Sequence, residues 1–137
     1  MSAPFFVDTN VLLYASLQPD ARSEAARALL ARRGTISIQV LNEFANVASR
    51  KLHRAWPEIV QALAAIRVLC APPWPLTVAT HEAGLAISGR TGYRLYDALI
   101  IAAALEAGCT TLFSEDLHEG QLIDGRLTIR NPFGPGG

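Results

Sequence analysis

The feature that most constrains this chain is a short apolar run that ends abruptly in polar residues, Phe5-Phe6-Val7-Asp8-Thr9-Asn10. Residues 5–7 predict a strand buried on both faces, because three consecutive apolar residues leave no polar face. Asp8 then stands at the carboxyl end of that strand. In open α/β sheets, ligands bind just outside the carboxyl ends of the strands. Asp8 is therefore a candidate functional residue.

Helix and strand patterns alternate along the rest of the chain. Apolar positions recur every three or four residues over 57–70, and residues 95–107 are apolar nearly all round, which predicts a surface helix and a buried helix. Other helices are expected over 21–33, from 39 or 42 to about 52, and from 77 or 80 to about 89, with strands at 35–38, near 76, at 110–113 and, on a sheet edge, at 127–129. Gly34 is expected to end the helix before it. The alternation predicts an α/β fold with a mostly parallel central sheet flanked by helices.

The length of 137 residues suits a single domain spanning 1–137, in which the Pro- and Gly-rich residues 131–137 are expected to form a flexible tail. Twelve basic residues balance twelve acidic ones, which argues against disorder and against nucleic-acid binding through a basic tail. Cys70 and Cys109 lack the spacing of a zinc site or a disulfide framework, so we expect free thiols in a reducing cytoplasm. We expect neither a signal peptide nor a membrane span.

Four acidic residues stand out because each is embedded in an apolar segment or ends one: Asp8, Glu43, Asp97 and Asp116. Each has a simpler explanation by itself. Asp8 could cap the next helix, and Asp97 could simply be an acid in a helix first turn, where the helix dipole stabilises negative charge. Glu43 could lie on an exposed helix face, and Asp116 could form an Asx-turn. Taken together, however, all four follow strands or begin helices, and in a parallel sheet these ends share one edge. We therefore expect them to face one cleft.

Four carboxylates in one cleft repel one another, so protons or metal ions must compensate their negative charge. A pair ~4 Å apart costs about 4 kcal/mol at an effective dielectric near 20. Oxygen ligands without nearby Cys or His suit Mg²⁺, for which Mn²⁺ can substitute. We expect Asp8, Asp97 and Asp116 to be metal ligands, and these three with Glu43 to form the catalytic site. A metal-bound water would supply a nucleophile at neutral pH, so the chemistry fits phosphodiester hydrolysis by one ion or two.

Other polar residues are expected to support these acids. Asn10 and Ser114 are positioned in the sequence to orient carboxylates or waters. Arg94 lies about one helical turn before Asp97, where it could bind phosphate or neutralise the acids. Arg50 and Lys51 belong to the densest basic cluster and are further candidates for contact with RNA.

The sequence resembles the PIN domain, specifically the VapC-like toxins of bacterial type II toxin–antitoxin pairs. The resemblance rests on residues 6–12, 40–44, 96–100 and 113–117, in that order, and residues 131–133 are similar to one subset of these toxins. It implies a Mg²⁺-dependent ribonuclease that cuts structured or translational RNA, a homodimer, and a small VapB-like antitoxin that blocks the site. By position it implies that Asp8, Glu43, Asp97 and Asp116 are the metal-site acids, with Ser114 as the hydroxyl before the last acid. Glu115 is an additional acid that could contribute its charge or face solvent.

Three alternative functions, two enzymatic and one not, are compared with this hypothesis. A phosphatase of the haloacid dehalogenase type also begins with an aspartate after a strand, but it needs a second aspartate two residues later, where this chain has Asn10. A metal-dependent phosphohydrolase that is not a toxin remains a further enzyme alternative. A catalytically silent PIN-like interaction domain is disfavoured, because unused buried carboxylates are costly.

Overall fold

The computed structural model describes residues 4–134. Its elements, in chain order, are β1 (Phe5–Val7), α1 (Thr9–Ser16), α2 (Ser23–Ala31), α3 (Ile38–Arg50), α4 (Trp56–Leu69), α5 (Val78–Thr91), α6 (Leu95–Glu106), β2 (Thr111–Phe113), β3 (Leu122–Ile123) and β4 (Leu127–Arg130). Over these residues, no helix combines the length and the apolar character needed to cross a membrane. The predicted α/β fold is confirmed.

The four strands form one sheet in the order β1-β2-β4-β3. β1, β2 and β4 run parallel, with Phe6 opposite Leu112 and Leu112 opposite Ile129. β3 pairs antiparallel with β4 and forms the edge. The prediction that residues 127–129 form an edge strand is therefore wrong. The two-residue β3 pairs with the outer edge of β4, and Leu127 and Ile129, which point to the same face of β4, are fully buried.

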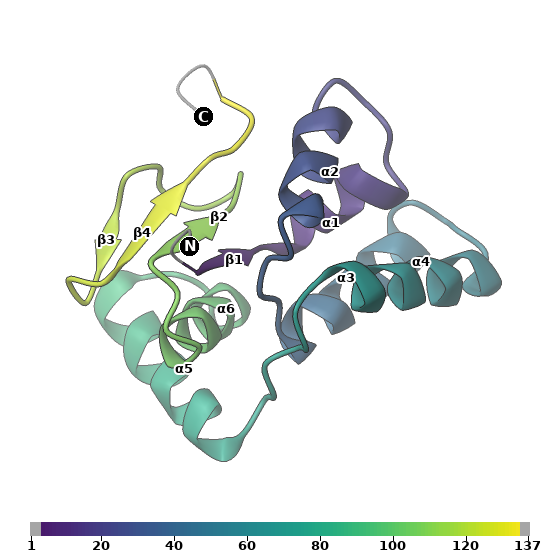
Figure 1. The fold of residues 1–137 in the computed structure, drawn as a ribbon. Coiled ribbons are helices and arrows are strands. Elements are labelled where there is room, and N and C mark those ends of the chain that lie inside the picture. The colour runs from purple at the N-terminus through teal and green to yellow at the C-terminus, as the bar shows by residue number, and fades with distance from the viewer. Residues whose placement is uncertain (1–3, 135–137) are drawn as a thin grey trace.

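Helix α6 is the centre of the core. All residues from Ala98 to Leu105 are buried, as expected for a segment that is apolar nearly all round. α6 packs against α5 and contacts α3. Figure 1 shows α5 and α6 together below the strands, while α1 to α4 gather on the other side of β1. The carboxyl ends of β1 and β2 open between these two groups of helices.

The predicted strand at 35–38 is wrong in extent. Thr35 forms only an isolated parallel bridge to Phe6, and α3 already begins at Ile38. The reason is local, because the Ser37 side chain accepts a hydrogen bond from the Val40 N–H at 3.2 Å and so caps the helix. The strand expected near Leu76 is likewise wrong, since the chain makes only an isolated bridge between Trp74 and Ser37.

Helix α2 is shorter than the predicted range 21–33, and Gly34 does not serve as its left-handed C-terminal residue. That backbone conformation falls on Arg33, with φ of 58°. Gly34 instead lies against β1, where a Cβ would stand 2.6 Å from Phe5 Cε2 and 2.8 Å from Val7 Cγ2. The glycine is therefore needed for the close approach of the chain to β1.

The predicted tail is described only in part. Asn131 Oδ1 accepts a hydrogen bond from the Phe133 N–H at 2.8 Å. The Phe133 ring packs edge-on against Tyr14, with centroids 5.3 Å apart. Residues 135–137 lie outside the described residues. The end of the described chain thus returns to helix α1, beside the carboxyl end of β1.

Candidate active site

A cleft of about 540 Å³ opens at the carboxyl ends of β1 and β2, and the four predicted acids line it. Asp8 directly follows β1, and Asp116 lies three residues after β2. Glu43 projects from α3, and Asp97 from the first turn of α6. Four separate elements thus bring these carboxyl groups to one cavity.

Asp8 is the most buried of the four, with 4% of its surface exposed. Its Oδ1 accepts from the Thr9 N–H at 2.6 Å, so it caps α1, and its Oδ2 accepts from Ser114 Oγ at 2.7 Å. Burial raises the pKa of Asp8 to about 6. The two hydrogen bonds oppose that rise, while the nearby charges of Asp116 and Asp97 add to it. Capping the helix and facing the cleft are therefore compatible roles.

Glu43 is half-buried in the same cleft and not on an exposed helix face. Burial raises the pKa of its carboxyl to about 7, and the charges of Asp8 and Asp97 contribute to the rise. A hydrogen bond from Gln39 Nε2, 3.3 Å long, opposes it. Glu43 therefore exchanges protons close to neutral pH.

The other two acids differ in their surroundings. Burial raises the pKa of Asp97, the Arg94 guanidinium lowers it, and Asp116 raises it further. Asp116 is exposed to solvent, and its Oδ2 accepts from Asn10 Nδ2 at 2.9 Å. Its own N–H donates to Ser114 Oγ at 3.2 Å. Asn10 and Ser114 each contact an acid in the way that residues orienting carboxylates would.

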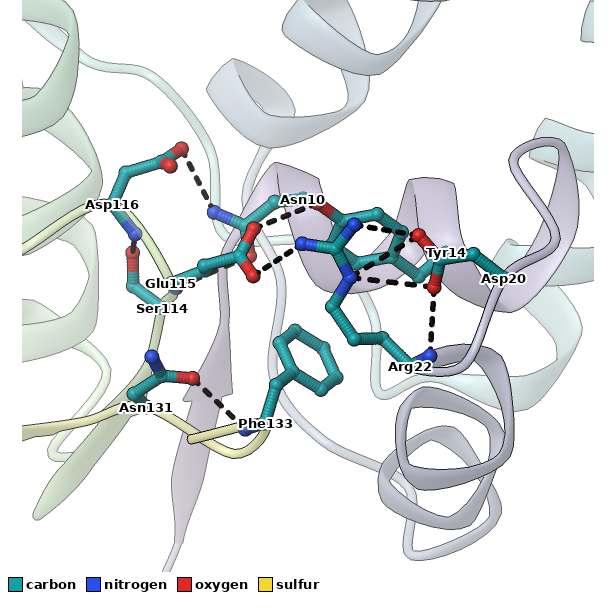
Figure 2. A network of polar contacts seen from close by, with 9 residues as sticks. All are labelled: Asn10, Tyr14, Asp20, Arg22, Ser114, Glu115, Asp116, Asn131 and Phe133. Carbon is teal, nitrogen blue, oxygen red and sulfur yellow. Dashed lines mark hydrogen bonds and ion pairs between the residues drawn. The ribbon is translucent and has the colours of Figure 1, made fainter. Parts of the chain in front are cut away.

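Glu115 is partly buried and turns toward α1 and α2, not into open solvent (Figure 2). Its Oε1 accepts from the Tyr14 hydroxyl at 2.7 Å, and its Oε2 accepts from Arg22 Nη1 at 2.6 Å. Burial and the bond to Glu115 raise the pKa of Tyr14 to about 12. Tyr14 therefore remains a hydrogen-bond donor throughout the physiological pH range.

Of the three basic residues predicted to contact RNA, Lys51 and Arg94 line the cleft. Arg50 is not among the lining residues, and its Nε donates to Asn46 Oδ1 at 3.2 Å on the exposed side of α3. No ion pair within residues 4–134 involves any of the four cleft acids. Their charges are therefore not compensated by a direct protein partner in the described chain.

The donor chemistry of the cleft fits a hard divalent cation. All candidate ligands are carboxyl oxygens, and burial together with repulsion from neighbouring acids raises the pKa of Asp8, Glu43 and Asp97 when no cation is bound. Within residues 4–134, no three carboxyl, imidazole or thiol groups stand close enough to hold one ion together. Mg²⁺ keeps several waters and usually takes only one or two protein carboxylates, so its binding does not require a closed three-ligand cage.

Sequence reasoning did not find Tyr14 and Arg22, which hold Glu115. Tyr14 lies four residues after Asn10, on the same face of α1, and this helical spacing could have indicated it. Arg22 lies 93 residues from Glu115, and nothing in its local pattern indicates the contact.

A family model described as the PIN domain matches residues 5–118 of the chain. A solved structure of VapC20 from Mycobacterium tuberculosis, described as a sarcin-ricin loop cleaving toxin, is 25% identical, with 82% of this chain and 91% of that chain covered and a TM-score of 0.66. VapBC2 from Rickettsia felis, solved with a DNA fragment from their promoter, is 19% identical, with 93% and 97% covered and a TM-score of 0.66. This second likeness shows the fold alone. No curated protein matches the chain.

Proposed function

This chain belongs to the PIN domain family and has a VapC-like fold, and from that premise we propose that it is a metal-dependent endoribonuclease. We propose further that it is the toxin of a type II toxin–antitoxin pair. The observation that carries the proposal is the convergence of four carboxyl groups, from four elements, on one cleft without a paired cation in the described chain. The likeness to a loop-cleaving toxin supports RNA as the substrate.

In this proposal Asp8, Asp97 and Asp116 form the site of Mg²⁺, which Mn²⁺ can replace, with one or two of the carboxylates bound directly and the rest through the waters of the ion. When bound, the ion supplies an activated water and compensates the charge that develops on the phosphodiester. Ser114 and Asn10 fix the orientation of the Asp8 and Asp116 carboxyl groups through bonds of 2.7 and 2.9 Å. Such supporting bonds hold carboxyl ligands in one orientation.

Glu43 is suited to proton transfer, because a pKa of about 7 lets it accept or return a proton at the operating pH. Arg94 and Lys51, on the wall of the cleft, are suited to bind the phosphates on either side of the reacting one. They provide the local positive charge that RNA binding requires in a chain whose net charge is zero.

The proposed partners follow from the same assignment. We propose a VapB-like antitoxin that blocks the cleft, as the resemblance of the sequence to VapC-like toxins implies. A homodimer, a single domain over residues 1–137 and action in the cytoplasm complete the proposal.

The test uses purified protein freed of bound antitoxin and incubated with total bacterial RNA. Four reactions are needed: wild type with Mg²⁺, wild type with EDTA, Asp97→Asn with Mg²⁺, and Glu24→Gln with Mg²⁺. Glu24 is an exposed acid on α2 outside the cleft, so its variant controls for loss of one negative charge. Discrete cleavage by wild type and Glu24→Gln with Mg²⁺, and by neither of the other two, is expected.

Two further measurements, a phosphatase assay and thermal unfolding with and without Mg²⁺, separate the alternatives. Release of phosphate from small monoesters without cleavage of RNA would favour a phosphatase. Absence of cleavage together with no Mg²⁺-dependent shift in Tm would indicate a silent interaction domain.

A further inference from the structure

We propose that Tyr14 and Arg22 are positioning residues that hold Glu115 and thereby fix the loop after β2, so that Asp116 faces the other cleft acids. This inference rests on the proposed function and assigns a role to an acid outside the metal-binding set. Tyr14, Arg22 and Glu115 are called the clasp below.

The clasp engages both oxygens of Glu115. The Tyr14 hydroxyl donates to Oε1 at 2.7 Å, and Arg22 Nη1 donates to Oε2 at 2.6 Å. Tyr14 comes from α1 and Arg22 from the turn before α2, roughly a hundred residues earlier in the chain than Glu115. The two bonds therefore join the N-terminal helices to the loop that carries Asp116.

Arg22 is itself held in place (Figure 2). Its Nη2 and Nε donate to Asp20 Oδ2 at 2.6 and 3.1 Å. Its guanidinium stacks over the Tyr14 ring, 4.1 Å from the centroid, while the Phe133 ring packs nearly perpendicular to the Tyr14 ring. A guanidinium fixed at two points presents its remaining donor to Glu115 with little loss of side-chain entropy.

Asn10 connects the clasp to Asp116. Its Oδ1 accepts from the Glu115 N–H at 3.4 Å, and its Nδ2 donates to Asp116 Oδ2 at 2.9 Å. One amide side chain thus contacts both the clasped residue and the acid beside it. A displacement of Glu115 would therefore move the backbone that places Asp116.

The other end of the loop is held independently. The Tyr93 hydroxyl accepts from the His118 N–H at 3.0 Å and donates to Gln121 at 2.5 Å. Asp116 is an exposed side chain between these two attachments, next to the buried Leu117. Release of the clasp would leave the Asp116 side of the loop held by the weaker bonds to Asn10 and by Ser114, without the two bonds to the Glu115 carboxylate.

The clasp also controls charge. Glu115 lines the same cleft as the metal-site acids. With Arg22 removed, its carboxylate would be free to turn toward them and to compete for the ion. This predicts that neutralising Glu115 partly restores function when Arg22 is absent, which a purely structural ion pair would not do.

The experiment measures Mn²⁺ binding by calorimetry and amide hydrogen exchange of the metal-free protein in wild type, Arg22→Met, Tyr14→Phe and Arg22→Met/Glu115→Gln. Arg90→Met is the matched control, because it breaks an ion pair of 2.5 Å to Asp124 at a similarly exposed position away from the cleft. In Arg22→Met and Tyr14→Phe, exchange is expected to accelerate in residues 114–121 but not in α6. The Mn²⁺ dissociation constant is expected to rise about tenfold, as is typical for residues behind metal ligands.

The double variant is expected to bind Mn²⁺ more tightly than Arg22→Met, and Arg90→Met to resemble wild type. If both single variants bound Mn²⁺ as tightly as wild type, the proposed role of the clasp would be overturned, while the proposed function would stand. If wild type bound no Mn²⁺, the proposed function would be overturned, and the positioning role of the clasp would be overturned with it. If Arg22→Met did not fold, Tyr14→Phe would decide, because it removes one hydroxyl and keeps the ring packing.

Discussion

Ser114 Oγ donates a hydrogen bond of 2.7 Å to Asp8 Oδ2, and both residues are buried, with 0% and 4% of their surfaces exposed. The bond joins the carboxyl ends of two neighbouring parallel strands, β1 and β2. It also lowers the pKa of Asp8 against the larger effect of burial. One hydroxyl therefore contributes both to the fold and to the charge state of the cleft.

Replacement of this hydroxyl should destabilise the protein in a pH-dependent way. Ser114→Ala is expected to lower the free energy of unfolding by about 1.5–3 kcal/mol at pH 8, where Asp8 is ionised, and by about 1 kcal/mol at pH 5. Urea unfolding in EDTA at both pH values measures the difference. Ser49→Ala, on the exposed side of α3, is the control and should change stability by less than about 0.5 kcal/mol. Equal losses at both pH values would contradict the assignment.

The metal-free protein should gain stability from Asp8→Asn at neutral pH. Because the pKa of about 6 in the folded protein lies above the ordinary aspartate value of 3.8, the stability of wild type falls as pH rises from about 4 to 6 and stays low above that range. This pKa difference means that ionisation of Asp8 lowers the free energy of unfolding by roughly 3 kcal/mol. Chemical unfolding in EDTA at pH 7.5 should show Asp8→Asn to be the more stable protein, while it loses RNA cleavage. A destabilised variant, or one that cuts RNA at the wild-type rate, would contradict the site.

Divalent metal binding should weaken in mild acid. Metal ligands bind in their deprotonated form, and a bound cation also favours ionisation of an acid beside it; burial raises the pKa of Asp8, a ligand, to about 6 and of its neighbour Glu43 to about 7. The affinity for Mn²⁺ is therefore expected to be constant above pH 7.5 and to fall as pH decreases from 7 to 5.5. Calorimetry in buffers of different ionisation enthalpy should detect proton release at pH 6.5 and little at pH 8. Glu43→Gln should reduce the proton release at pH 6.5, and a pH-independent affinity would refute the expectation.

Two glycines offer a matched test of packing. Gly34→Ala should lower the free energy of unfolding by about 1–3 kcal/mol, because its Cβ would stand 2.6 Å from Phe5 Cε2. Gly89→Ala, in α5 with no atom within 4 Å of the added Cβ, should instead stabilise the protein by about 0.5–1 kcal/mol. Urea unfolding midpoints compare the two variants directly. If Gly34→Ala were as stable as Gly89→Ala, the close approach to β1 would be wrong.

The convergence of the acids was predictable because it follows from topology. Asp8 and Asp116 follow strands that pair in parallel, and Asp97 begins the helix before β2, so the alternation of elements was enough to bring them together. The capping role of Asp8 and the burial of α6 also follow from local pattern. These features depend on residues adjacent in sequence or on the direction of whole strands.

The features that sequence reasoning missed depend on distant contacts or on very short elements. β3 has only two residues, too few to show an alternating pattern. The strand expected at 35–38 is cut short because Ser37 caps helix α3, which begins at the next residue. Arg22 reaches Glu115 only because α1 and α2 fold back beside the loop after β2. A single sequence carries no signal for such a pairing.

The two borders of the sheet have a consequence for how the protein behaves at high concentration. On the β1 side, Thr35 donates to Phe5 and accepts from Val7, and on the other side the sheet ends in a strand of two residues. An unprotected strand edge would template the addition of strands from neighbouring molecules. With both borders occupied or short, the protein should resist growth into β-aggregates, and association with other chains should proceed through its helices.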